Sequence, residues 1–226
     1  MEKLIAALKE FTEKDITEIE ENDRQFKAIK KLYEKFKGKE EEFYKLVVIN
    51  ALMSYQLQMK GEEYWENFAA FFSDGKGIED FEKFLKRFNK RFLTAKLKRL
   101  KKAINCVSQV KVEQVRNANR LVEELAKCMR QKKDSKTIVF AAKMMNYAVR
   151  IAEGKELTGL EKIAIPLDSR IKKVSGNKDF WKKLSEKTGI PQIKLDAVFW
   201  ICQNEEHLKS LPKNLVAKLR EIKERI

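Results

Sequence analysis

Glycine and proline are scarce in this chain, which has 8 Gly and 3 Pro in 226 residues. An all-β fold needs many tight turns, and this composition does not supply them. Apolar residues recur instead at intervals of three and four, as in Phe26, Ile29, Leu32 and Phe36. No segment alternates apolar and polar residues for long enough to form a strand. We therefore predict an all-α protein, a compact bundle of about ten short helices.

The helix boundaries follow from the apolar spacing and from a few clear breaks. The segment Ser73–Gly77 is a loop, Pro166 keeps Ile165 out of helical geometry, and Gly189 separates two late helices. The length fits one domain or two closely packed small ones. The predicted helices cover residues 3–8, 26–36, 41–59, 62–72, 78–90, 94–108, 111–130, 136–152, 168–175, 177–188, 192–204 and 212–225.

The charge balance points to a polyanionic partner. Lys and Arg total 49 against 34 Asp and Glu, a net charge of +15. Thermophile composition raises Lys and Glu together, so it does not explain the surplus, and nucleic acid is the favoured partner. The segment 83–102 holds ten basic residues and no acid. A solvated helix face is the plain alternative, but we predict that this segment faces phosphates.

The rare residues exclude several kinds of chemistry. Cys106, Cys128 and Cys202 form no CxxC pair, which disfavours zinc and iron–sulfur sites, and we expect reduced, mostly buried thiols. His207, the one histidine, is expected to be solvated near a helix end. No phosphate-binding glycine motif is present. The longest apolar run, Ala197–Cys202, has six residues, so we expect no membrane span and a cytosolic protein.

Lys136 is the first candidate for catalysis. It follows the basic turn 130–135 and begins a segment, 137–148, that is apolar nearly all round and should be a buried helix. Both a helix N-terminus and burial favour the neutral amine, which is a nucleophile able to form a Schiff base. The spacing alone favours a lysine that simply extends into water. Lys143, two turns along the same face, lies among Ala and Met residues.

Asp168 has a similar double interpretation. It follows Pro166 at the position of an N-cap for the predicted helix 168–175. As a catalytic carboxylate, it could instead stabilise a developing cation or carry a proton. Trp65 and Trp200, taken singly, fit a hydrophobic core. Gln25 and Asp196, taken singly, fit the surface.

Together these segments resemble the archaeal 8-oxoguanine DNA glycosylases (AGOG) of the helix-hairpin-helix glycosylase superfamily. The resemblance runs in order from about residue 20 to 202. It rests on short blocks of sequence: DRQF (23–26), NALMSY (50–55), KGEEYWE (60–66), SKTIVF (135–140), KMMNYA (143–148), IPLDSR (165–170) and LDAVFW (195–200).

The resemblance implies a bifunctional glycosylase and abasic-site lyase in base excision repair. It implies that Lys136 attacks C1′ of the damaged nucleotide and that Asp168 supports the charge on the sugar. One domain over residues 1–226, made of two packed helical subdomains with a cleft, would bind the flipped base. The resemblance assigns the base-binding role to Gln25, Ser54, Trp65, Phe140, Lys143, Pro166, Asp196 and Trp200.

The same resemblance implies no metal, no organic cofactor, and DNA carrying 8-oxoguanine as the partner. A monomer in the cytoplasm, associated with the nucleoid, is our default expectation. The superfamily's glycine-rich hairpin is replaced here by the charged residues 130–135. Two other functions stay open at this stage. One is a non-catalytic, basic helical protein that binds nucleic acid. The other is a basic thermophilic protein with a protein partner.

Overall fold

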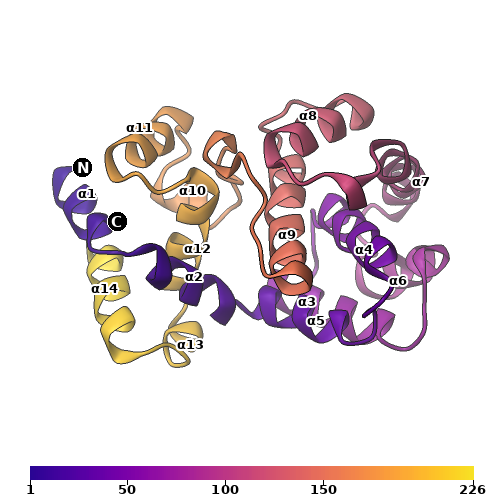
Figure 1. Cartoon of the computed structure of the whole chain (residues 1–226), viewed down its shortest axis with the longest axis horizontal. Coiled ribbons are helices and arrows are strands. Elements are labelled where there is room, and N and C mark those ends of the chain that lie inside the picture. The colour runs from indigo at the N-terminus through magenta and orange to yellow at the C-terminus, as the bar shows by residue number, and fades with distance from the viewer. The chain divides into compact units, whose positions relative to one another are not determined.

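The computed structural model covers residues 1–226 and is helical throughout (Figure 1). It contains fourteen α-helices and three short 3₁₀ helices. No sheet forms, and the one β-bridge joins Asn117 to Thr158. The predicted all-α fold class is confirmed. None of these helices combines the length and the apolar composition that crossing a lipid bilayer requires.

The chain divides into two compact units, which we call the central unit (residues 24–160) and the terminal unit (residues 1–23 and 161–226). The 3₁₀ helix η3 (Leu160–Lys162) lies where the chain passes from one unit to the other. The helices of the central unit are α3 (Arg24–Tyr33), α4 (Glu40–Met53), α5 (Gly61–Phe72), η1 (Ile78–Asp80), α6 (Phe81–Phe88), α7 (Leu93–Val110), η2 (Val112–Gln114), α8 (Ala118–Met129) and α9 (Lys136–Glu153). Those of the terminal unit are α1 (Glu2–Lys9), α2 (Glu13–Asn22), α10 (Ile171–Val174), α11 (Lys178–Thr188), α12 (Gln192–Cys202), α13 (Glu205–Leu208) and α14 (Lys213–Glu224).

The centre of the central unit is α9, which packs against α3, α4 and α8 (Figure 1). From Thr137 to Val149 every residue of α9 is buried except Phe140. The helix is apolar nearly all round because neighbours cover almost every face, which confirms the predicted buried helix. It ends at Gly154, whose left-handed φ of +67° suits a residue without a side chain.

In the terminal unit the corresponding helix is α12, which packs against α2, α11, α13 and α14. Its apolar residues join a core that includes Trp181, Leu195 and Phe199. The Trp181 and Phe199 rings meet edge to face, with centroids 5.0 Å apart. His207, predicted to be solvated, is instead buried in α13 with 3% of its surface exposed. Its acidic neighbours made it look like a surface residue.

Several helix boundaries differ from those predicted, because contacts distant in sequence decide them. The predicted helix 41–59 ends at Met53, where Asn89 Nδ2 donates to the Met53 carbonyl and Arg99 Nε donates to that of Leu52. In place of the first part of the predicted helix 111–130, the left-handed Lys111 is followed by the 3₁₀ helix η2. The helix α8 begins only at Ala118, after its N-cap Asn117.

Two α-helices, α2 and the four-residue α13, were not predicted. The mostly polar sequence of α2 hides a capping box between Thr12 and Asp15, and Ile16 and Ile19 are buried.

The basic segment 83–102 is only partly a charged surface. Seven of its ten cations are exposed, but Lys96, Arg99 and Lys102 point inward and bind carbonyl groups. Lys96 is completely buried, and its Nζ also donates to the Asn89 side chain. Burial lowers the pKa of Lys96 to about 8, and the nearby Arg91 charge adds to the effect. The prediction that the whole segment faces phosphates is therefore wrong for these three residues.

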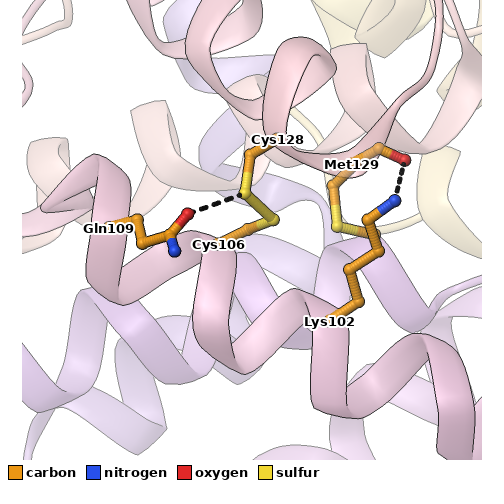
Figure 2. Close-up of a disulfide and its surroundings, with 5 residues drawn as sticks. All are labelled: Lys102, Cys106, Gln109, Cys128 and Met129. Carbon is orange, nitrogen blue, oxygen red and sulfur yellow. Dashed lines mark hydrogen bonds between the residues drawn. A yellow bond between two sulfur atoms is a disulfide. The ribbon is translucent and has the colours of Figure 1, made fainter.

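The expectation of reduced thiols is wrong for two of the three cysteines. A disulfide joins Cys106 of α7 to Cys128 of α8 (Figure 2). Only Cys202 is a free, buried thiol. Beside the disulfide, Lys102 Nζ donates to the Met129 carbonyl at 2.9 Å. Two residues that are 22 apart in sequence give no local signal for such a pair. The bond ties α7 to the helix that leads into the basic turn.

Breaking this disulfide should lower the stability of the chain. Closing a loop of 22 residues is worth about 3 kcal/mol, which at this chain length corresponds to a fall in Tm of roughly 6–12 °C. Calorimetry of the oxidised protein and of the double variant Cys106→Ala/Cys128→Ala measures the difference. Cys202→Ala serves as the control for loss of a buried thiol. Equal Tm values for the double variant and the oxidised protein would contradict the assignment.

Candidate active site

Lys136 is the first residue of α9 and follows a tight connection from α8. Arg130, the C-terminal cap of α8, adopts the left-handed conformation that glycine usually takes, with φ of +51°. The Gln131 N–H then donates to the Ala126 carbonyl at 2.9 Å, and the Ser135 N–H donates to that of Lys132 at 3.0 Å. The charged turn thus closes as a helix–hairpin–helix without any glycine.

Arg99 of α7 fixes the start of α9. Its Nη2 donates to Gln131 Oε1 at 2.8 Å and to Thr137 Oγ1 at 2.9 Å. The same guanidinium reaches the Leu52 carbonyl at 3.1 Å, at the end of α4. Burial lowers the pKa of Arg99, although arginine is normally charged at every physiological pH. One partly buried cation therefore links the hairpin, the first turn of α9 and the segment that carries Ser54.

The Lys136 side chain is exposed, and no hydrogen bond or ion pair holds its Nζ. This exposure agrees with the alternative that spacing alone favoured, a lysine that extends into water, because the covered part of α9 begins one residue later, at Thr137. Lys143, two turns further on, is the buried lysine, with 3% of its surface exposed. Its Nζ lies 5.4 Å from the centre of the Tyr147 ring. The exposed amine is open to a macromolecular substrate, whereas the buried one is not.

Aromatic rings of the predicted base-binding set meet on α5 and α9. Trp65 is completely buried and packs edge to face on the half-buried Phe140, with ring centroids 6.1 Å apart. The Trp65 indole N–H has no hydrogen-bond partner although it is buried.

Gln25 of α3 is also buried and packs against Gly61, the first residue of α5. A Cβ added at Gly61 would lie 3.3 Å from Gln25 Nε2, so glycine there permits the close approach.

Ser54 ends α4 and is buried, and its hydroxyl donates to the Asn50 carbonyl at 2.8 Å. The Asn50 amide, one turn earlier, is completely buried, and neither its oxygen nor its nitrogen has a hydrogen-bond partner. Buried amides in proteins are nearly always satisfied. Asn50 is therefore a further candidate polar residue of the site. It begins the segment NALMSY (50–55), but it was not among the predicted base-binding residues. A buried polar residue in an apolar helix is the signal that could have found it.

The remaining predicted residues lie in the terminal unit. Asp168 caps the turn before α10, since its Oδ1 accepts the N–H groups of Arg170 and Ile171, both at 2.8 Å. The cap interpretation of Asp168 is confirmed. Its Oδ2 receives no hydrogen bond and is available for another role. The preceding Pro166 is buried, and its carbonyl accepts the Asp168 N–H at 2.7 Å.

Asp196 and Trp200 lie four residues apart on α12 and so share one face of that helix. Asp196 is buried with 4% of its surface exposed, and Trp200 is half-buried. The Arg170 guanidinium lies on the Trp200 ring, with Cζ 3.5 Å from the ring centre. Arg170 ends the segment IPLDSR (165–170), but it was not among the predicted site residues. No feature of the sequence alone predicted its contact with this tryptophan.

The predicted set is thus divided between the two units. The central unit carries Lys136 with Gln25, Ser54, Trp65, Phe140 and Lys143, and the terminal unit carries Asp168 with Pro166, Asp196 and Trp200.

A separate groove of about 990 Å³ lies between α7 and α8, and none of the predicted catalytic or base-binding residues lines it. The disulfide forms part of its wall, and it is rimmed by the cations Lys102, Lys111, Arg120, Lys127 and Arg130.

A helical protein with an unpaired lysine at the start of a helix–hairpin–helix has the features of a DNA glycosylase with lyase chemistry. Comparisons with known proteins support this class. The family model for AGOG, described as N-glycosylase/DNA lyase, matches residues 5–225. The chain belongs to this N-glycosylase/DNA lyase family. The predicted family and the predicted enzyme class, a DNA repair glycosylase and lyase, are thereby confirmed.

Individual relatives agree with the family match. The chain is 40% identical over 214 residues to an N-glycosylase/DNA lyase of Nanoarchaeum equitans, covering 93% of each protein. It is 36% identical over 217 residues to one of Thermococcus kodakarensis, covering 88% of this chain and 82% of the relative.

A solved structure has the same fold. It is the 8-oxoguanosine complex of Pa-AGOG, an 8-oxoguanine DNA glycosylase from Pyrobaculum aerophilum. The two match with a TM-score of 0.81 at 24% identity, over 97% of this chain and 95% of the other.

Proposed function

We propose that this enzyme removes 8-oxoguanine from DNA and then cuts the strand, with Lys136 as the nucleophile. The observation that carries the proposal is the exposed, unpaired amine of Lys136 on the first turn of α9. The similar fold of a glycosylase solved with 8-oxoguanosine supports the choice of base. We propose that the protein acts as a monomer, with one copy of the chain bound at one 8-oxoguanine in the DNA.

In the proposed reaction the lesion first leaves the base stack, because C1′ is shielded inside a duplex. The deprotonated Lys136 amine attacks C1′, and the bond between C1′ and the base breaks as the base takes a proton. Opening of the sugar ring leaves an imine between Nζ and C1′. Loss of a proton from C2′ then expels the 3′ phosphate, and water releases the lysine.

Asp168 is proposed to act through the carboxylate oxygen that the cap does not use. While Oδ1 holds the turn, Oδ2 is free to stabilise positive charge on the sugar or to move a proton. A carboxylate whose backbone is fixed in this way needs little reorganisation when charge develops.

The base itself offers a basis for selection. 8-Oxoguanine carries a hydrogen on N7, where guanine has only an acceptor. The buried Gln25 is proposed to offer its amide oxygen to that N–H. Guanine would place its own N7 acceptor against this oxygen instead of a donor, so the hydrogen bond would be lost and guanine disfavoured. Trp65, Phe140 and Trp200 are proposed to supply flat apolar surfaces for the purine.

The direct test is release of the free base. Two duplexes that differ only in one 8-oxoguanine or one guanine are incubated with the enzyme, and released base is quantified by mass spectrometry. The proposal predicts release from the first duplex, strand cleavage at that position, and no release from the second. Equal release from both, or none from either, would reject 8-oxoguanine as the substrate.

A further inference from the structure

We propose that Arg170 is a positioning residue for the base-binding site, and this inference rests on the proposed function. Its guanidinium covers one face of the Trp200 indole and fixes the plane of that ring. A flipped purine then stacks on the opposite face.

The contact between the two side chains is direct. Arg170 Cζ lies 3.5 Å from the centre of the Trp200 ring, which is van der Waals distance for stacked planar groups. A guanidinium is flat and stacks on aromatic faces, which an ammonium group cannot do. The Arg170 side chain therefore leaves no room for a base on the face that it covers.

No hydrogen bond determines the orientation of the Trp200 ring. Its indole N–H is buried and has no hydrogen-bond partner. Trp181, in the same unit, shows the usual alternative, because its indole N–H donates to the Ser175 carbonyl at 2.9 Å. Arg170 lies directly on the Trp200 ring, so its removal should allow the ring to tilt.

The backbone of Arg170 is held by the proposed catalytic carboxylate. Asp168 Oδ1 accepts the Arg170 N–H at 2.8 Å, and this bond fixes where the arginine side chain begins. The helices α10 and α12 are in contact, so the capped turn lies beside the helix that carries Trp200. Asp168, Arg170 and Trp200 therefore form one connected array within the terminal unit.

The test compares Arg170→Ala, Arg170→Lys and Lys172→Ala. Lys172 is an exposed cation on α10 and controls for loss of one charge near this surface. A cation–π contact of about 1.4 kcal/mol corresponds to a tenfold change in affinity. We expect both Arg170 variants to bind 8-oxoguanosine about tenfold more weakly, and to show greater acrylamide quenching of Trp200 in a Trp65→Phe/Trp181→Phe background. Lys172→Ala should match the parent protein.

Abasic-site DNA separates this proposal from the proposed chemistry. An abasic site has no base to stack, so borohydride trapping on it should stay within about twofold of the parent for both Arg170 variants. Three results would overturn the proposal. Rescue by Arg170→Lys would show that charge, not stacking, matters. Tighter nucleoside binding by Arg170→Ala would show that the arginine blocks the base site, and unchanged quenching and binding would show that it does neither.

If the proposed function itself fails, the parent enzyme will not trap abasic DNA. The quenching experiment uses the free protein and still decides whether Arg170 fixes the ring.

Discussion

Replacing Lys136 with glutamine should abolish borohydride trapping on DNA that contains 8-oxoguanine, with excision reduced at least about 10³-fold. Glutamine is polar and only one atom shorter than lysine, but its amide nitrogen is not nucleophilic and cannot form an imine. The Lys136 side chain is exposed and makes no hydrogen bond or ion pair, so folding should be unaffected. Trapping is read on a denaturing gel as a protein–DNA band.

Lys132→Gln is a matched control, because Lys132 is an exposed lysine of the same hairpin with no ion-pair partner. It should trap at nearly the parent level, and both variants should bind duplex DNA with similar, salt-sensitive affinity. Trapping by Lys136→Gln at the parent level would remove Lys136 from the reaction. Loss of DNA binding by Lys136→Gln alone would mean that Lys136 serves to bind DNA rather than to attack C1′.

Asp168→Asn should slow excision by about 10²–10⁴-fold while leaving the fold intact. The asparagine Oδ1 can still accept the N–H groups of Arg170 and Ile171, so the cap is kept and only the charge is lost. Asp168→Ala should lose the same activity and also about 1 kcal/mol of stability, because the cap is gone. Single-turnover kinetics and thermal unfolding measure the two effects separately.

The difference between the two variants isolates the role of the carboxylate. If Asp168→Asn excises at the parent rate, Asp168 is only a helix cap. Equal stability of the two variants would show instead that the cap contributes little.

Hydrophobic periodicity and composition were enough to predict the all-α class and the buried helix α9, because both depend on local pattern. They did not predict where α4 ends, since Asn89 and Arg99 reach its last carbonyls from elsewhere in the chain. Nor did they separate the outward cations of the segment 83–102 from Lys96, Arg99 and Lys102. A lysine that binds a buried carbonyl has the same spacing as one that faces water.

The base-binding residues were predicted from short segments that resemble the AGOG family, not from the spacing of apolar residues. Spacing correctly placed Lys136 on the first turn of a helix, but the covered part of that helix begins only at Thr137. The disulfide, the burial of His207 and the stacking of Arg170 on Trp200 all depend on tertiary packing. A single sequence contains no local pattern for any of them.

The central claim is that the Lys136 amine forms a covalent bond to the sugar of the excised nucleotide. Borohydride reduction of the reaction on an 8-oxoguanine duplex, followed by proteolysis and mass spectrometry, locates that bond directly. We predict one modified peptide, with the reduced sugar attached to Nζ of Lys136. An adduct on the buried Lys143 or on another residue, or excision with no adduct at all, would contradict the account.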